Sequence, residues 1–206
     1  MSELGHSVRI HEMPNEIPDA IPFSDDLTHA SYDPVYAERH WRALVQIDHV
    51  FKRFRSSFLG KSSPVHFFWG SFDLAVTRFS GRTAPLHPGG VPNLPNAVAQ
   101  EAYSHEVSSA GFWPSGPGVE YPAFYAYAYP EPEGYAKAPV EPTEAFYHET
   151  LKEFVLPYDA VRTAADPDQA LLDFLISTYE AAADAASWDR ASLECPLGVP
   201  GETRAV

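Results

Sequence analysis

Residues 64–82, with the sequence PVHFFWGSFDLAVTRFSGR, hold the densest run of apolar and aromatic side chains in the chain. Such a run is rich in β-forming residues and too short between breaks for a surface helix, so it predicts β-structure. Gly70 interrupts it, which predicts either one strand bent at a bulge or two strands about a corner. The run also carries three polar side chains, His66, Asp73 and Arg78. We therefore expect the rest of the domain to pack around this segment.

Two long helices are predicted, one before this segment and one near the end of the chain. Each starts with an Asp-Pro pair, Asp33-Pro34 and Asp166-Pro167, in which the aspartate caps the helix and proline suits its first position. Apolar residues then recur at three- and four-residue spacings, which predict one buried face per helix. Between the helices the sequence predicts a short helix at 143–151 and further strands at 103–112, 123–129 and 153–158. This order predicts an α+β domain, with a mostly antiparallel sheet of about five strands and two long helices packed on one face.

The length of 206 residues suits one domain with less regular ends. We expect an extended N-terminal arm at 1–23 with an edge strand at 8–13, a single α+β domain at 24–190 and a loose C-terminal tail at 191–206. Twenty prolines, against a usual share of ~5%, predict many irregular connections. The longest of them, at 80–100, has a length that is typical of lids, binding loops or disordered inserts.

Composition limits the classes of partner. A net charge of -14 argues against nucleic acid and against anionic membranes, since both require a basic surface. Cys195 is the single cysteine in the sequence, which excludes an intrachain disulfide and a cysteine-rich zinc site. No secretory signal and no apolar run of the ~18 residues of a membrane span is present. We therefore expect a cytoplasmic protein.

Histidines and carboxylates on the predicted strands suggest acid–base or metal chemistry. Imidazole and carboxylate are the usual ligands of catalytic zinc, iron or manganese, so a divalent metal is one hypothesis for a cofactor. No complete motif such as H-E-x-x-H supports it, and adjacent strand residues such as His105 and Glu106 point to opposite faces unless a bulge intervenes. The alternative is that buried histidines order the sheet by hydrogen bonding. The candidate catalytic residues are His66, Asp73 and His105, and the candidate metal ligands are His66, His105 and Glu106.

Aromatic side chains on the same strands suggest a small-molecule pocket. Tyr125 and Tyr127 alternate on one face of 123–129, and pockets are mostly apolar with a few converging polar groups. Arg78 would grip a carboxylate or phosphate of the ligand, or else pair with Asp73 in the sheet. An ordinary aromatic core is the alternative. The candidate ligand-binding residues are Trp69, Arg78, Tyr103, Trp113, Tyr125 and Tyr127.

Several segments together resemble a known family: IPFSDD…HASYDP, SPVHFFWGSFDLAVTRFSGR, AYSHEVSSAGFWP, FYAYAYPEP and LLDFLISTYEAAADAASWDRA. They are similar to the C-terminal part of a bacterial family of unknown function, the domain-of-unknown-function 5996 family, over Ser7–Ser192. The resemblance implies that longer members carry an additional N-terminal region similar to a divergent copy of this module. A chain with one module would then regain the missing contact by forming a homodimer. The resemblance implies no established activity.

The leading functional hypothesis is a protein that binds or transforms a small molecule in an aromatic-lined pocket, with His, Asp and Arg as polar groups and metal assistance as a variant. The alternative is a non-catalytic interaction module that binds a second copy or another protein through its sheet. The sequence leaves open whether the protein is an enzyme.

Overall fold

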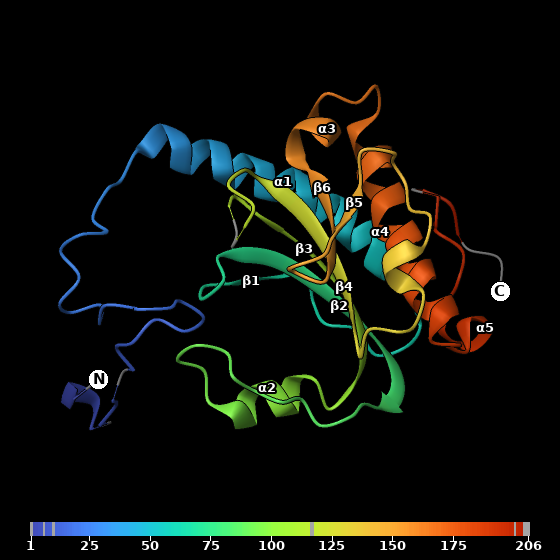
Figure 1. Cartoon of the computed structure of the whole chain (residues 1–206). Coiled ribbons are helices and arrows are strands. Elements are labelled where there is room, and N and C mark those ends of the chain that lie inside the picture. The colour runs from blue at the N-terminus through green and yellow to red at the C-terminus, as the bar shows by residue number, and fades with distance from the viewer. Residues whose placement is uncertain (1, 6, 10, 116–117, 200, 204–206) are drawn as a thin grey trace.

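The computed structural model describes residues 2–5, 7–9, 11–115, 118–199 and 201–203. Among these residues, six strands form one antiparallel sheet in the order β1-β2-β3-β4-β6-β5 (Figure 1). The strands are β1 (His66–Phe68), β2 (Asp73–Thr83), β3 (His105–Trp113), β4 (Ala123–Tyr129), β5 (Phe146–His148) and β6 (Glu153–Pro157). The predicted α+β architecture is confirmed, with one strand more than expected.

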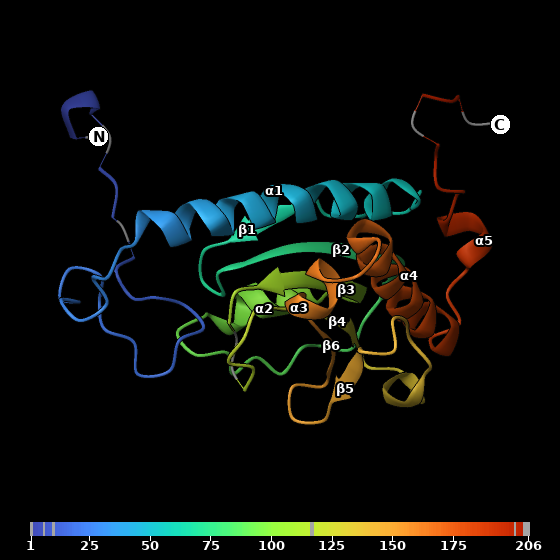
Figure 2. The ribbon, with the colours of Figure 1, turned by 90° about the horizontal axis from the view of Figure 1, so that it is seen from above.

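Two long helices, α1 (Pro34–Ser56) and α4 (Pro167–Ala185), pack on one face of the sheet, as Figure 2 shows from above. Asp33 accepts hydrogen bonds from the backbone N–H groups of Val35 and Tyr36, and Asp166 accepts one from Gln169. Both predicted helix starts are therefore confirmed. The shorter helices are η1 (Ser2–Leu4), α2 (Asn96–Ala102), η2 (Tyr135–Lys137), α3 (Tyr158–Arg162) and α5 (Arg190–Leu193). None of the described helices combines the length and the apolar character that a membrane span needs.

The hydrophobic core lies between the sheet and the two long helices. Alternate side chains of the central strands, such as Val76, Phe124 and Leu156, are fully buried there. The remaining side chains of these strands point to the opposite face, because the side-chain direction alternates along a strand. That second face therefore holds a separate set of residues, which includes Asp73 and Tyr125.

The segment 64–82 folds as a hairpin, which excludes the bulge considered for Gly70. In the register of β1 and β2, His66 lies opposite Ala75 and Phe68 lies opposite Asp73. The turn between the strands contains Phe72 with a positive φ of 57°. Cross-strand partners share a face of the sheet. His66 and Asp73 therefore lie on the same face, the one that points away from α1 and α4.

Three connections differ from their predictions. The described residues within 8–13 form no strand, and Ile10 lies outside the described residues. The long loop predicted at 80–100 is shorter in the structure than in the prediction, because β2 continues to Thr83 and α2 begins at Asn96. Residues 143–151 contain β5 in place of a helix. Pairing with β6 satisfies the backbone of this segment, so tertiary context overrides its weak local preference.

Residues 190–195 are attached to the end of α1, although the sequence predicted a loose tail from residue 191. The backbone N–H of Leu59 donates to the carbonyl of Leu193, and that of Cys195 donates to the carbonyl of Ser57. Just before this segment, Trp188 is buried against the helical layer. Within the tail, residues 200 and 204–206 lie outside the described residues.

Candidate functional site

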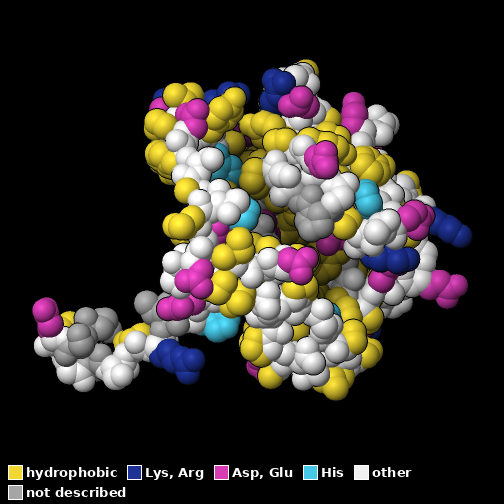
Figure 3. All heavy atoms as spheres, turned by 60° about the vertical axis from the view of Figure 1, so that its left-hand side comes forward, with side chains coloured by type: hydrophobic (Ala, Val, Ile, Leu, Met, Phe, Trp, Pro, Cys, Tyr) yellow, Lys and Arg dark blue, Asp and Glu magenta, His cyan; other side chains and the backbone are white. Residues whose placement is uncertain are grey.

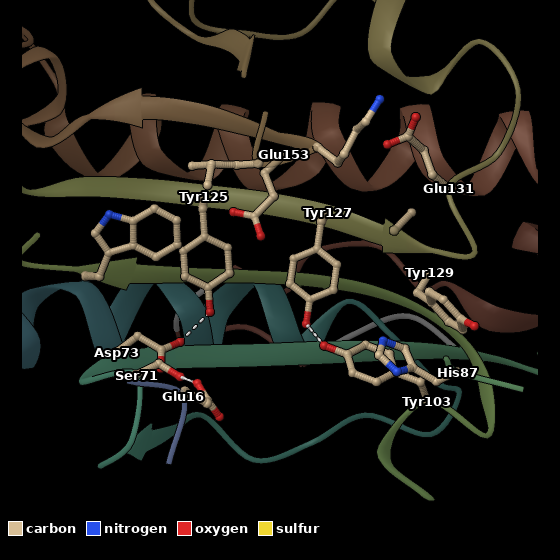
Figure 4. Close-up of a pocket in the computed structure, with 14 residues that line it drawn as sticks. Glu16, Ser71, Asp73, His87, Tyr103, Tyr125, Tyr127, Tyr129, Glu131 and Glu153 are labelled. Atoms are coloured by element: carbon tan, nitrogen blue, oxygen red, sulfur yellow. Dashed lines mark hydrogen bonds between the residues drawn. The ribbon is translucent and has the colours of Figure 1, made fainter. Parts of the chain in front are cut away.

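The sheet face that points away from α1 and α4 is hollowed into a cavity of about 660 Å³, which we call the tyrosine cavity (Figure 4). Its floor is made of residues of β2, β3, β4 and β6. Its rim comes from the N-terminal arm and from the connections that precede α2, follow β4 and precede β6. The size suits a small organic molecule. The lining residues are Glu16, Ser71, Asp73, His87, Tyr103, Trp113, Tyr125, Tyr127, Ala128, Tyr129, Glu131, Leu151, Lys152 and Glu153.

Tyr125 on β4 reaches across β3 to Asp73 on β2, where its hydroxyl donates a hydrogen bond to Asp73 Oδ2. The residue between them is Gly111, which lies opposite Tyr125 in the sheet register. A Cβ at position 111 would overlap Tyr125 Cζ and Oη. The absence of a side chain therefore lets the phenol ring lie flat on the β3 backbone. This glycine sets the geometry of the floor.

The aromatic rings of the floor form a continuous stack. Trp113 and Tyr125 have ring centres 4.3 Å apart at 17°, and Tyr125 and Tyr127 have ring centres 6.1 Å apart at 15°. Tyr127 Oη lies 2.8 Å from the hydroxyl of Tyr103, the residue that follows α2. Burial raises the pKa of Tyr125 and Tyr127 well above its usual value, so both remain protonated phenols. The two tyrosine side chains are therefore uncharged.

Asp73 is the most deeply buried acid of the cavity, with 4% of its surface exposed. Oδ2 accepts the bond from Tyr125, but Oδ1 is buried and has no hydrogen-bond partner among the described residues. Burial raises the pKa of this carboxyl even though the bond from Tyr125 acts in the opposite direction. Asp73 therefore presents one unsatisfied oxygen atom in the cavity wall.

Glu153 begins β6 and is a half-buried acid of the same cavity. Tyr125 lies opposite Val155, and Glu153 alternates with Val155, so Glu153 shares the cavity face. Figure 4 shows its carboxyl pointing between Tyr125 and Tyr127. Its Oε2 atom is buried without a hydrogen-bond partner among the described residues. Burial, with a smaller effect from the charge of Asp73, raises the pKa of Glu153 to about 8.

The sequence predicted part of this site. Five candidates line the cavity, namely Asp73, Tyr103, Trp113, Tyr125 and Tyr127. Sequence reasoning missed Glu153, although it is the one charged residue of the apolar strand EFVLP and its alternation with Val155 was a usable signal. His87, which stacks on Tyr103 with ring centres 4.7 Å apart, and Glu16 come from irregular segments, where no periodicity identifies a face.

The three candidate metal ligands are not brought together. His66 is paired with Ala75 and His105 is paired with Thr83, positions that are roughly 26 Å apart along β2 at ~3.3 Å per residue. Glu106 instead forms an ion pair of 2.6 Å with Arg82. Within the described part of the chain, no group of three or more His, Cys, Asp or Glu side chains could hold a metal ion. Since neither His66 nor His105 lines the cavity, the expected catalytic trio reduces to Asp73.

Arg78 and Trp69 also lie outside the tyrosine cavity. Arg78 is five positions from Asp73 on β2, so the alternation of the strand directs it to the helical side. Its guanidinium carbon lies 3.5 Å from the ring centre of Phe54, and Nη2 donates to the Phe54 carbonyl and to Ser57 Oγ. Arg78 therefore binds the C-terminal end of α1 instead of a ligand. Trp69 occupies the β1–β2 turn with 82% of its surface exposed.

Comparison with known proteins agrees with the resemblance found in the sequence. One family model, described as a family of unknown function (DUF5996), matches residues 1–195 of the 206. The match extends beyond Ser7–Ser192 at both ends and includes every residue of the tyrosine cavity. No significant match was found among curated proteins or among solved structures. The chain therefore belongs to the DUF5996 family, a family of unknown function.

Proposed function

We propose that the protein binds a small polar organic molecule in the tyrosine cavity, with Asp73 and Glu153 as the polar groups that contact it. One observation carries this proposal: Asp73 Oδ1 and Glu153 Oε2 are both buried without hydrogen-bond partners among the described residues, and both residues line one cavity. An unpaired buried polar group costs ~1–3 kcal/mol. Two such atoms at one cavity favour a ligand whose donors pair with them.

The same two carboxyl groups are suited to general acid–base chemistry. A carboxyl with a pKa of about 8 holds its proton at neutral pH and can donate it to a ligand. Pairs of acids whose surroundings shift their pKa values are a common basis for acid and base roles in enzymes. In a reaction at this site, Glu153 would supply the proton and Asp73 would accept one. These two residues replace His66 and His105 as the candidate catalytic groups.

Binding is tested with a fragment set of cationic, neutral and anionic compounds, screened against the full chain by ligand-observed NMR. We expect hits that bind the wild type and the Trp69→Ala variant equally, because Trp69 lies outside the cavity. We expect the same hits to lose at least about tenfold in affinity in Asp73→Asn, since a neutral amide replaces the carboxyl whose Oδ1 is the free acceptor and hydrogen bonds to charged groups are about twice as strong as neutral ones. Hits that bind wild type and Asp73→Asn with equal affinity would contradict the proposal.

A second candidate function, self-association, is favoured by an apolar groove on the other side of the molecule. This α1 groove has a volume of about 1080 Å³ and lies between the N-terminal half of α1, the β1–β2 turn and α3. Figure 3 turns this side of the molecule forward and shows hydrophobic side chains gathered in the upper part of the view. Trp41 and Trp69, both in the lining, have 62% and 82% of their surfaces exposed. Exposed aromatic clusters of this kind mark interaction surfaces.

The charge of the α1 groove argues for a second copy of the chain as the partner. Two copies with a net charge of -14 each repel one another, so they approach best where carboxylates are scarce. Asp159 is the one acid among the lining residues, and it is paired with Arg162 at 2.6 Å.

Light scattering after size-exclusion chromatography tests this candidate. We expect the wild type to be a dimer and the Trp41→Glu variant, which places a charge in the groove, to be a monomer. A wild-type monomer at micromolar concentration would rule out this candidate.

A further inference from the structure

We infer that the ligand of the tyrosine cavity is an organic cation, such as a protonated amine, that lies between Asp73 and Glu153. This inference rests on the proposed function and names its ligand class. It is carried by the charges that line the cavity, by the aromatic character of its wall and by the two unpaired carboxyl oxygens.

The cavity has a marked excess of acidic side chains. Four carboxyl groups line it, from Glu16, Asp73, Glu131 and Glu153, against one lysine, Lys152, and no arginine. Among the described residues none of the four forms an ion pair: Glu16 accepts a hydrogen bond from Ser71, and Glu131 accepts one from Tyr147. Among the described lining residues Lys152 is thus the one side chain with a permanent positive charge, and it forms an ion pair with none of the four acids. An anionic ligand would be repelled, whereas a cation would relieve the repulsion.

The aromatic wall favours the same ligand class. Trp113, Tyr125 and Tyr127 stack along the floor, and a second group of rings closes the other end. In that group, Tyr103 and Tyr129 have ring centres 5.2 Å apart, and His87 stacks on Tyr103. The faces of aromatic rings attract cations through their negative quadrupole, with the strongest effect at desolvated sites. Acidic groups among aromatic rings are the chemistry that recognises ammonium ions.

The donor set favours an organic ammonium over a metal ion. Calcium requires six to eight oxygen ligands, and magnesium binds through several waters with an octahedral geometry. The described residues contain no group of three metal-ligating side chains. A primary ammonium carries three N–H donors. Two of them can pair with Asp73 Oδ1 and Glu153 Oε2, the two buried carboxyl oxygens of this cavity that have no partner within the described part of the chain.

The test uses the full chain and pairs of compounds that differ in charge. Benzylamine and cyclohexylamine are compared with benzyl alcohol, cyclohexanol and benzoate by calorimetry and by thermal shift. We expect both amines to bind at least about tenfold more tightly than the neutral and anionic compounds, as charge-assisted hydrogen bonds are about twice as strong as neutral ones. Glu153→Gln is expected to weaken amine binding by a similar factor. The matched control is Glu149→Gln, which replaces an exposed acid and is expected to leave amine binding unchanged.

The outcomes separate this inference from the proposed function. If benzyl alcohol or benzoate binds as tightly as benzylamine and Asp73→Asn abolishes that binding, the cation inference fails and the cavity remains a ligand site. If the amines bind equally well to wild type and Glu153→Gln, the cation inference also fails. If none of the five compounds binds, the inference fails together with the proposed function.

Discussion

Replacing Gly111 with alanine is expected to lower the free energy of unfolding by about 2 kcal/mol, within the usual range for overpacking. The new Cβ would overlap the phenol ring of Tyr125, which is held in place by the stack on Trp113 and by the bond to Asp73. Alanine at an unstrained glycine position would otherwise stabilise the chain slightly. The expected loss therefore comes from displacement of Tyr125. Urea denaturation of the two proteins measures it, and binding of benzylamine is expected to weaken in parallel.

Gly70→Ala is the matched control for this prediction. A Cβ at position 70 would meet its nearest atom at 3.7 Å, an ordinary van der Waals contact. We expect this variant to change the free energy of unfolding by less than about 0.5 kcal/mol. In a double-mutant cycle, Tyr125→Leu is expected to remove most of the cost of Gly111→Ala. Equal stability of Gly111→Ala and wild type would show that Tyr125 does not lie across β3.

Replacing Glu153 with glutamine is expected to stabilise the protein at alkaline pH and to have little effect at acidic pH. The pKa of Glu153 is raised from 4.5 to about 8 in the folded state, so the folded chain holds a proton that the unfolded chain has released. The wild type therefore loses stability as the pH rises from 4.5 to about 8. Glutamine is neutral throughout and avoids this loss. At about pH 9, the free energy of unfolding of Glu153→Gln should exceed that of the wild type by about 3 kcal/mol. This is less than the full change in the pKa of Glu153 implies, because the partial exposure of its side chain lets water screen the charge.

Urea denaturation at about pH 5 and about pH 9 measures this effect, with Glu149→Gln as the control. The groups that surround the Glu153 carboxyl are Asp73 on β2, Tyr125 and Tyr127 on β4, His148 opposite it on β5, and Lys152 beside it. Asp73 also has a raised pKa, so its ionisation likewise lowers the stability of the folded state as the pH rises. Asp73 is present in both proteins, so this effect is common to the two curves. The exposed Glu149 should give a difference below about 0.5 kcal/mol at both pH values. Parallel stability curves for Glu153→Gln and wild type would show that Glu153 is not desolvated.

The parts of the fold that the sequence predicted have strong local signals. The Asp-Pro pairs at Asp33 and Asp166 mark the starts of α1 and α4, because capping and proline geometry are decided within a few residues. Strict alternation in 123–129 identifies β4 with the correct ends. β5 was missed because a strand of three residues forms only through its pairing with β6. The attachment of residues 190–195 to α1 likewise depends on contacts between distant segments.

The candidate site was predicted in part, from strand alternation for some residues and from residue type for others. Tyr125 and Tyr127 were found by the alternation of 123–129, and Asp73 was chosen as a carboxylate on a predicted strand. The alternation rule applied to Glu153 would have added the second acid. The candidate metal ligands were chosen by residue type without a strand register, and the structure places His66 and His105 on the same sheet but far apart along β2. Arg78 was expected either to contact a ligand or to pair with Asp73. The alternation of β2 places Arg78 on the face opposite to Asp73, under α1, where it contacts Phe54. Irregular segments such as the one that carries His87 gave no signal.

The most direct test of the paired-acid site is a carbon-detected NMR titration of the side-chain carboxyl groups, with and without benzylamine. We predict that one glutamate carboxyl, absent from the spectrum of Glu153→Gln, titrates at about pH 8 in the free protein. Its midpoint should fall when benzylamine is added, because the ammonium stabilises the carboxylate. The account is contradicted if every glutamate titrates near its usual pKa of ~4.3, or if benzylamine leaves the midpoint of Glu153 unchanged.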